Sequence, residues 1–367
     1  MTPDIAEGNF VSEWFGHRIY PNVTSTARSL ADQVAQQCPF LSAAKASPQE
    51  CVKRPASKGV CTISSRSNGP RQDWVVCPYR LVEPTLLRII AARLYGLGQD
   101  FGLYAAPTLA AEDTRTAIVD RPKGGERVFV YFDLKLGGEI SLSATESSPE
   151  MAFDVTVVEL QRTNGSITLG KFALIEAQTM DFHGTYAHAV ENLSQALRLH
   201  GADFPAALRE NPQWAAERIE GPNIANVFKR TFYQLMFKFS FGANPSCAGT
   251  ALALPLSVWD SWQPFLSSPE LASASDGTLR LAVPGEEIVV DPTAWIYVFD
   301  FNSSASVTPN PVEVMMTIGA TTDALSHFAL KEAPRVASVQ LMSESGMYAS
   351  LSRRLRSYWP DHPMART

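Results

Sequence analysis

Four of the five cysteines fall within forty residues of the chain, and this cluster constrains the fold more than any other feature. The four are Cys38, Cys51, Cys61 and Cys77, separated by 12, 9 and 15 residues. The segment 49–71 between them is rich in basic residues and poor in apolar ones, so it needs a cross-link in order to fold. Clustered thiols in a chain without a secretion signal bind metal more often than they form disulfides.

Four thiolates suffice for one tetrahedral structural site that holds iron or zinc. The spacings lack the short Cys-x2-Cys knuckle of common zinc fingers, so four unrelated buried thiols are the alternative. The pattern predicts a small N-terminal region, residues 1–82, with a metal-binding loop built on the four cysteines. Cys247 precedes an apolar run and is predicted to be a core residue.

The composition is that of an ordinary globular protein, because 45% of the 367 residues are hydrophobic and 19% are charged. The net charge of −6 argues against a surface that coats nucleic acid, although it allows one basic cleft. No apolar stretch approaches the ~20 residues that a membrane span requires. The acidic N-terminus does not resemble a signal peptide. We therefore expect a soluble, cytoplasmic protein that does not contact a membrane.

Residues 83–367 show patterns of a single catalytic domain that would also mediate dimerisation. The patterns predict helices over 84–96, 185–199, 223–239 and 344–358, and strands over 127–133, 152–160, 171–178, 249–256 and 294–301. The order is typical of a mixed sheet flanked by helices, an α/β or α+β enzyme core. Segment 267–292, rich in Ser, Pro, Gly and acidic residues, is predicted to be a surface insertion.

The Asn164-Gly165 pair is the strongest short hairpin signal in the chain, and it lies between two predicted strands. A two-residue turn there places Asp154 opposite Ile175, or opposite Glu176 after a slip of one residue. Two carboxylates on adjacent antiparallel strands would then lie within a few ångströms of each other.

Gln178 is two residues beyond Glu176, so its side chain leaves the same face of the strand and joins this cluster. Carboxylates held so close together repel unless a cation or a proton separates them. Mg²⁺ is normally held by one or two carboxylates together with water and substrate phosphate. We expect Asp154 and Glu176 to bind Mg²⁺; the alternative is a pair of solvent-facing or hydrogen-bonded acids on an edge hairpin.

The pattern Asp…Glu-x-Gln resembles the PD-(D/E)xK nuclease motif, with glutamine in place of the lysine. Longer segments resemble the NotI-type restriction endonuclease family and occur in the same order along nearly the whole chain. These are EWFGHRIYP (13–21), CPFLSAAK (38–45), KLGGEISLS (135–143), TMDFHG (179–184), GPNIANVFKRTFY (221–233) and VWDSWQ (258–263).

The resemblance implies a type II restriction endonuclease, a homodimer that cuts double-stranded DNA with Mg²⁺ at a G/C-only palindrome. The expected site is GCGGCCGC or a relative that keeps the CGGCCG core. Carried over position by position, the four clustered cysteines would bind a structural iron. Asp154, Glu176 and Gln178 would form the catalytic core, and Glu139 would be an accessory carboxylate.

The missing lysine is a departure from the family motif. Gln178 cannot carry positive charge or act as a base, so it can only orient water or a phosphate oxygen. Lys135 could approach the site, but a solvated surface lysine is the simpler interpretation. Lys229, Arg230 and Lys238 are candidates for phosphate contacts, and a solvated helix face accounts for them equally well.

The competing hypothesis is a metal-stabilised DNA-binding or regulatory module that has lost catalysis. The set Glu139, Asp154, Glu176 and Gln178 favours the enzyme, because a decayed nuclease would have no reason to keep every acid. No residue is assigned to reading bases.

Overall fold

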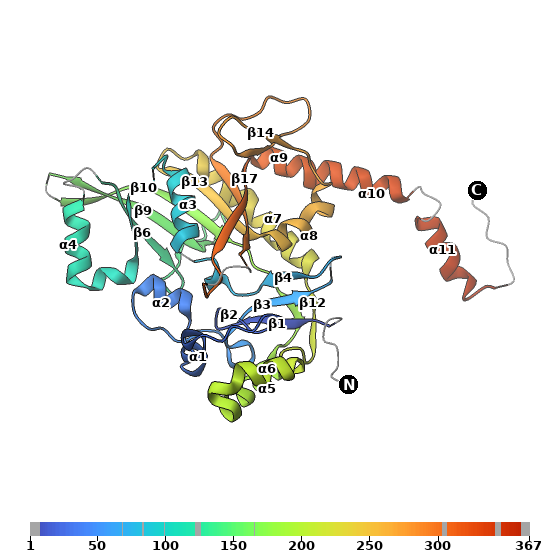
Figure 1. Ribbon diagram of the computed structural model, residues 1–367. Helices are drawn as coiled ribbons and strands as arrows, with labels where there is room; N and C mark the ends of the chain where they lie inside the picture. The colour runs from blue at the N-terminus through green and yellow to red at the C-terminus, as the bar shows by residue number, and fades with distance from the viewer. Residues whose placement is uncertain are drawn as a thin grey trace.

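The computed structural model describes residues 8–67, 69–82, 84–98, 100–121, 126–164, 166–302, 307–341 and 346–360 (Figure 1). Residues 1–7, on which the signal-peptide prediction depends, lie outside this set, as do Gly165 of the predicted turn and Glu344 of the last predicted helix. Within the described ranges, no helix is both long enough and apolar enough to span a membrane.

The described part of the chain is organised around a sheet of nine strands. From one edge to the other they are β14 (Leu271–Ser273), β15 (Leu279–Leu281), β17 (Val312–Ala320), β16 (Ala294–Phe301), β13 (Cys247–Pro255), β10 (Ser166–Ala177), β9 (Val155–Thr163), β6 (Val128–Asp133) and β5 (Gly102–Ala105). The neighbours β10, β13 and β16 run parallel, whereas β9 is antiparallel to both β10 and β6. The sheet is therefore mixed, as the sequence predicted.

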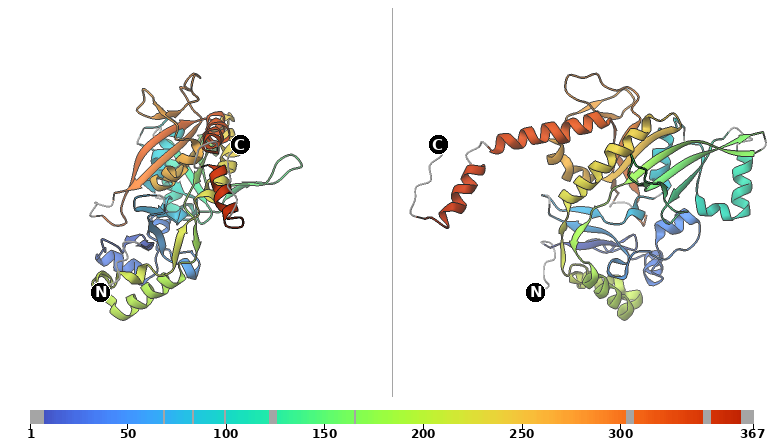
Figure 2. Two further views of the ribbon diagram at one scale, coloured as in Figure 1. Left: turned by 90° about the vertical axis from the view of Figure 1, so that its right-hand side faces the viewer. Right: turned by 180° about the vertical axis from the view of Figure 1, so that it is seen from behind.

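Helices cover both faces of this sheet, because its central strands are apolar on both sides. On one face Ile175 and Tyr297 pack in a core shared with α3 (Pro84–Leu94). On the other face Leu252 and Ile296 pack against α7 (Ile224–Ser240), α8 (Leu256–Leu266) and α9 (Thr322–His327). Figures 1 and 2 show α3 on the opposite side of the sheet from α7 and α8. The predicted arrangement of a mixed sheet flanked by helices is confirmed.

The N-terminal residues form a second, smaller sheet in the order β2 (His17–Arg18), β1 (Phe10–Trp14), β3 (Val60–Ser65) and β4 (Gln72–Val75). Its apolar side packs against α5 (Ala187–His200) and α6 (Phe204–Glu210). Helices α1 (Ala27–Val34) and α2 (Pro39–Lys45) lie between β2 and β3 in the sequence. Phe40 and Val75 of this region share a core with Ile90 and Phe129. The predicted domain boundary near residue 82 therefore crosses a continuous core, and the division into two domains stays a prediction.

The remaining elements lie outside these two sheets. They are α4 (Glu112–Asp120), the strand pairs β7 (Ile140–Leu142) with β8 (Met151–Phe153) and β11 (Phe182–Gly184) with β12 (Ile219–Pro222), and the helices α10 (Ala333–Leu341) and α11 (Met347–Arg356). Short 3-10 turns span Pro55–Ser57, Pro78–Arg80, Ala106–Ala110, Gly201–Asp203, Pro212–Ala215 and Phe241–Ala243, and a π turn spans Phe328–Glu332. Helices α10 and α11 extend away from the rest of the molecule (Figures 1 and 2).

Segment 267–292 differs from its prediction as a plain surface insertion. It contributes β14 and β15, and β15 extends the main sheet by pairing in parallel with β17. Arg280 and Leu281 are buried in this segment. The few apolar residues are separated by Ser, Gly and Asp, so the strands are too short to produce a visible alternation.

Candidate functional site

The β9–β10 hairpin places Asp154 opposite Glu176. Near the turn Leu169 pairs with Leu160, but the register shifts by one residue before Phe172, and Ile175 pairs with Val155. The slip considered from the sequence therefore occurs, and it takes the form of a β-bulge. Asp154 Oδ2 accepts a hydrogen bond from the Ala177 backbone N–H at 2.9 Å, which fixes the carboxylate beside the end of β10.

Gly170 lies within the shifted stretch, where side chains from β9 press against the backbone. A Cβ at this position would lie 2.7 Å from Gln161 Nε2 and 2.8 Å from Glu159 Oε2. These atoms are the far ends of two flexible side chains, which would have to move aside for any larger residue at this position.

Glu176 is buried in an unusual electrostatic environment. Its Oε2 accepts a hydrogen bond from Nζ of Lys238 on α7, which is itself buried, while its Oε1 has no hydrogen-bond partner among the described residues. Burial and the charge of Asp154 raise the pKa of Glu176 to about 8, and the Lys238 cation opposes that rise. Two carboxyl groups and one ammonium group therefore lie close together in a space from which water is largely excluded.

The amide of Gln178 is held at both ends. The Thr231 hydroxyl of α7 donates to Gln178 Oε1, and Gln178 Nε2 donates to the carbonyl of Thr179. Asp154, Glu176, Gln178 and Thr231 line one cavity of about 20 Å³. A space of that size holds a single water molecule or a small ion.

Two further acids lie next to this cluster. Asp133 is buried at the end of β6, and its Oδ1 accepts a hydrogen bond from the backbone N–H of Lys135 at 2.8 Å. Burial raises the pKa of Asp133, and the charges of Asp154 and Glu139 raise it further. Glu139 is exposed and does not line the small cavity. The side chain of Lys135 is exposed, as the simpler interpretation expected.

Sequence reasoning grouped Lys238 with Lys229 and Arg230 as surface cations, but the structure separates them. Lys229 and Arg230 are exposed, and Arg230 pairs with Asp181 at 3.0 Å, whereas Lys238 is only 6% exposed. The helical period could have distinguished Lys238 from the two exposed residues in the sequence. Lys238 is seven residues after Thr231 and therefore lies on the buried face of α7. Asp133 was missed because it ends a strand predicted only as buried.

The four clustered cysteines come together from separate segments. Cys38 precedes α2, Cys61 lies in β3 and Cys77 follows β4, and these three are buried while Cys51 is half-buried. All are free thiols. Burial raises the pKa of Cys38 to about 12, whereas a hydrogen bond from Cys61 lowers the pKa of Cys77 to about 6.

The basic segment between these cysteines is fastened at Lys53, whose Nζ donates to the carbonyls of Val60 at 2.6 Å and Val76 at 3.2 Å. Among the described residues, no three His, Cys, Asp or Glu side chains are placed to hold one metal ion. The chemistry of the donors, as distinct from their placement, suits iron or zinc, since four reduced thiols pack in or against one core. The acid cluster fits Mg²⁺, which needs only one or two protein carboxylates, and Glu176 Oε1 is a buried acceptor that no described residue satisfies.

Comparison with protein-family models gave no match for this chain, and comparison with curated proteins gave none either. The resemblance to a nuclease family therefore rests on the sequence segments quoted above.

Proposed function

We propose that this protein is a type II restriction endonuclease that hydrolyses phosphodiester bonds within a G/C-rich palindrome in the presence of Mg²⁺. The observation that carries this proposal is the meeting of Asp154, Glu176 and Gln178 around one small cavity at the carboxyl end of β10, where the buried Lys238 bonds to Glu176. The recognition site is GCGGCCGC or a relative with the CGGCCG core, as the NotI-type resemblance implies.

The order of elements supports a PD-(D/E)xK core. Helix α3, strands β6, β9 and β10, helix α7 and strand β13 follow one another in the chain as helix, three strands, helix and strand, with β5, β7, β8, β11, β12 and the helices α4, α5 and α6 inserted between them. The acids lie on the β9–β10 hairpin.

Each residue of the cluster has a distinct role in this proposal. Asp154 and Glu176 hold Mg²⁺, which when bound polarises the phosphodiester and stabilises developing negative charge. Gln178, oriented by Thr231, positions the attacking water. Lys238 supplies from α7 the positive charge that the motif's lysine would carry, and Glu139 supports the cluster through Asp133.

The other proposed partners follow from the same resemblance. The four cysteines hold a structural iron, or zinc, that fastens the β3–β4 hairpin. The protein acts as a homodimer, because a palindrome is matched by a two-fold assembly. Helix α11 is the candidate dimerisation element, since no side chain of this described helix is buried and Leu351 and Leu355 are exposed.

The test is digestion of a plasmid that carries one GCGGCCGC site, with purified protein and Mg²⁺. We expect one discrete linear product from the wild type and none from Asp154→Asn or Glu176→Gln. Glu159→Gln is the matched control, because Glu159 is a buried glutamate on the same hairpin that pairs with Arg127 at 2.6 Å, away from the cavity.

Each other outcome contradicts the proposal in a different way. Binding of the plasmid without cleavage would favour the non-catalytic DNA-binding module. A smear would indicate a nuclease without sequence specificity. Cleavage by Asp154→Asn at the wild-type rate would move the active site elsewhere.

A further inference from the structure

A second cavity, of about 530 Å³, opens at the edge of the main sheet where the acid cluster lies. Strands β10, β13 and β16 are parallel, so their carboxyl ends meet at this edge. The Gln178 backbone N–H donates to the carbonyl of Ala253 near the end of β13, and Ser257 and Phe301, which line the cavity, follow β13 and end β16. By the strand register Glu176 faces Leu252 and then Ile296, so Asp300 of the cavity wall lies two strands across and four residues further along. At ~4.8 Å per strand and ~3.3 Å per residue, this places Asp300 roughly 16 Å from Glu176. Ligands of open α/β sheets bind outside the carboxyl ends of the strands.

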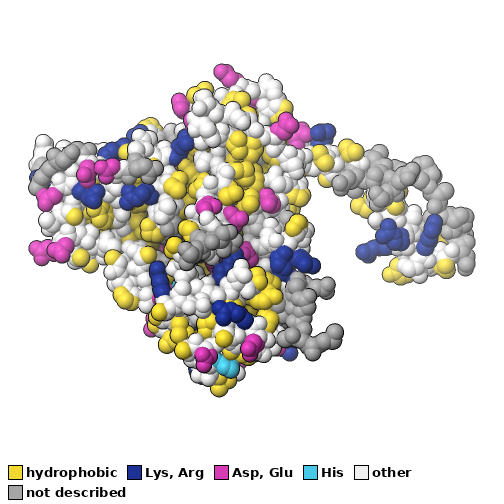
Figure 3. Space-filling model, in the orientation of Figure 1, with side chains coloured by type: hydrophobic (Ala, Val, Ile, Leu, Met, Phe, Trp, Pro, Cys, Tyr) yellow, Lys and Arg dark blue, Asp and Glu magenta, His cyan; other side chains and the backbone are white. Residues whose placement is uncertain are grey.

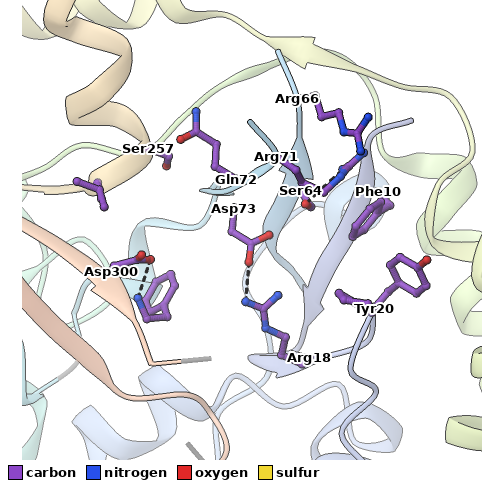
Figure 4. A pocket seen from close by; sticks show the side chains of 13 residues that line it. Phe10, Arg18, Tyr20, Ser64, Arg66, Arg71, Gln72, Asp73, Ser257 and Asp300 are labelled. Carbon is purple, nitrogen blue, oxygen red and sulfur yellow. Dashed lines mark hydrogen bonds and ion pairs between the residues drawn. The ribbon is translucent and has the colours of Figure 1, made fainter. Parts of the chain in front are cut away.

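Three guanidinium groups surround this cavity, and Figure 4 shows the side chains that carry them. Arg71 is held by Ser64 Oγ at 3.3 Å and by the Gly8 carbonyl at 2.8 Å, and it lies 4.8 Å from the centre of the Phe10 ring. Arg66, on the same β3–β4 turn, is exposed. Figure 3 shows Lys and Arg side chains gathered over the region of these strands.

Two buried polar atoms of the cavity wall have no hydrogen-bond partner within the described part of the chain. Ser257, only 5% exposed, leaves its Oγ without a partner, and Arg18 leaves its Nε without one although its Nη2 pairs with Asp73 at 2.6 Å. An unsatisfied buried polar group costs about 1–3 kcal/mol, so a ligand that reaches these atoms would gain from pairing with them.

The remaining lining defines the chemistry of the ligand. Phe10, Tyr20 and Phe301 offer aromatic surfaces, and Asp73 and Asp300 offer carboxylates. Guanidinium groups bind phosphate and the acceptor edge of guanine, carboxylates accept from base amino groups, and aromatic rings stack on bases. This combination matches a nucleotide.

We propose that this cavity holds a nucleotide of the bound DNA, a few positions along the strand from the scissile phosphate. Arg66 and Arg71 bind the backbone phosphate, and Ser257 and Asp300 face the base edge. The inference rests on the proposed nuclease function and adds to it the residues that contact DNA beyond the acid cluster.

A cavity of similar size, about 510 Å³, lies at the opposite edge of the same strands and provides a matched control. Arg93 lines it near the amino ends of β13 and β16 and pairs with Asp276 at 2.7 Å. Arg93→Ala therefore removes a cavity-lining arginine from the edge where we expect no DNA.

The experiment measures binding of a fluorescein-labelled duplex containing GCGGCCGC by anisotropy, with Ca²⁺ in place of Mg²⁺, over a range of salt concentrations. Arg66→Ala and Arg71→Ala should each lower the slope of log K against log salt by about 1, and weaken binding about tenfold near 0.1 M salt. Asp300→Asn should reduce the preference for GCGGCCGC over a duplex with one changed base pair. Arg93→Ala should leave both measurements unchanged.

The results separate this inference from the proposed function. Wild-type affinity and salt slope in Arg66→Ala and Arg71→Ala, in a protein that still cuts its site, would overturn the inference alone. An equal loss in Arg93→Ala would overturn it too, since the effect would then not belong to this edge. A wild-type protein that neither binds nor cuts the duplex would refute both. Tight binding of free dGMP, with duplex binding unaffected by the arginine variants, would also overturn it.

Discussion

Replacing Arg80 by Met should destabilise the protein by about 3–5 kcal/mol, because the buried carboxylate of Glu13 would lose its ion-pair partner. Arg80 and Glu13 are both fully buried, and Nε and Nη2 of the arginine each lie 3.2 Å from a Glu13 oxygen. Arg80 Nη2 also donates to the Asn310 carbonyl at 2.7 Å, and its guanidinium lies 3.8 Å from the centre of the Phe301 ring. These contacts join β1, the end of the cysteine region and β16.

The same loss of stability follows from the pKa of Glu13. Burial opposes the charge of Glu13, yet Arg80 and Thr62 hold the pKa of Glu13 below its ordinary value. Without Arg80 the carboxyl would instead take up a proton in the folded state. Holding that proton at pH 7, against an unfolded pKa near 4.5, costs about 3.4 kcal/mol at 1.36 kcal/mol per unit. The two magnitudes agree.

The sign of the pH dependence makes the prediction specific. In the wild type the Glu13 contribution is present above pH 4.5 and is lost as the pH falls through the lowered folded-state pKa. In Arg80→Met the folded state binds a proton that the unfolded state releases, so stability falls as the pH rises above 4.5. The gap between the two proteins should therefore widen by about 2–3 kcal/mol between pH 5 and pH 7.

Urea denaturation followed by tryptophan fluorescence at pH 5 and pH 7 measures this gap. The double variant Glu13→Gln with Arg80→Met is the control, and it should lose the pH-dependent part of the difference. A loss below about 1 kcal/mol in Arg80→Met at pH 7, or a gap that is the same at both pH values, would refute the reasoning.

Four further outcomes are expected. Lys238→Met should slow single-turnover cleavage by ~10²–10³-fold while duplex binding in Ca²⁺ is retained; an unchanged rate would remove the lysine from the site. Elemental analysis should find about one iron or zinc per chain in the wild type and none in Cys61→Ser, and full metal content in the variant would contradict the four-cysteine site. Leu351→Glu combined with Leu355→Glu should convert a dimer into a monomer in sedimentation, whereas a dimer that persists would place the interface elsewhere. Burial lowers the pKa of His17, so its contribution to stability is complete above pH 6.5 and is lost as the pH falls; His17→Gln should lose less stability than the wild type between pH 6.5 and 5, by urea midpoint.

The sequence predicted the elements that have strong local signals. Helix α7 was expected over 223–239 and spans Ile224–Ser240, and β16 was expected over 294–301 and spans Ala294–Phe301. Helix α7 carries apolar residues at the helical period, and β16 begins with a continuous apolar run of the length of a buried strand. Strands β14 and β15 have three residues each, and no periodicity can be seen in so short a stretch.

The candidate site was predictable only up to the register of its hairpin. The turn at Asn164 restricted Asp154 to two partners, but the choice between them depends on the bulge around Gly170. The register shift lies between Leu169 and Phe172 and depends on pairing across two strands, which no local pattern encodes. Lys238 reaches Glu176 across 62 positions of sequence for the same reason. Long-range contacts decide which charged residues become buried.

The cysteine region and the larger cavity are connected through the Arg80 ion pair. Arg80 lies three residues after Cys77, and its guanidinium stacks on Phe301, which lines that cavity. Cys61 lies in β3 and Cys77 just after β4, whereas Arg66 and Arg71 lie at the turn between these strands. A metal bound by the cysteines would thus fix the base of a hairpin whose other end carries two arginines. The acid cluster lies on a separate hairpin, β9–β10, so loss of that metal should impair DNA binding before it alters the geometry of the acids.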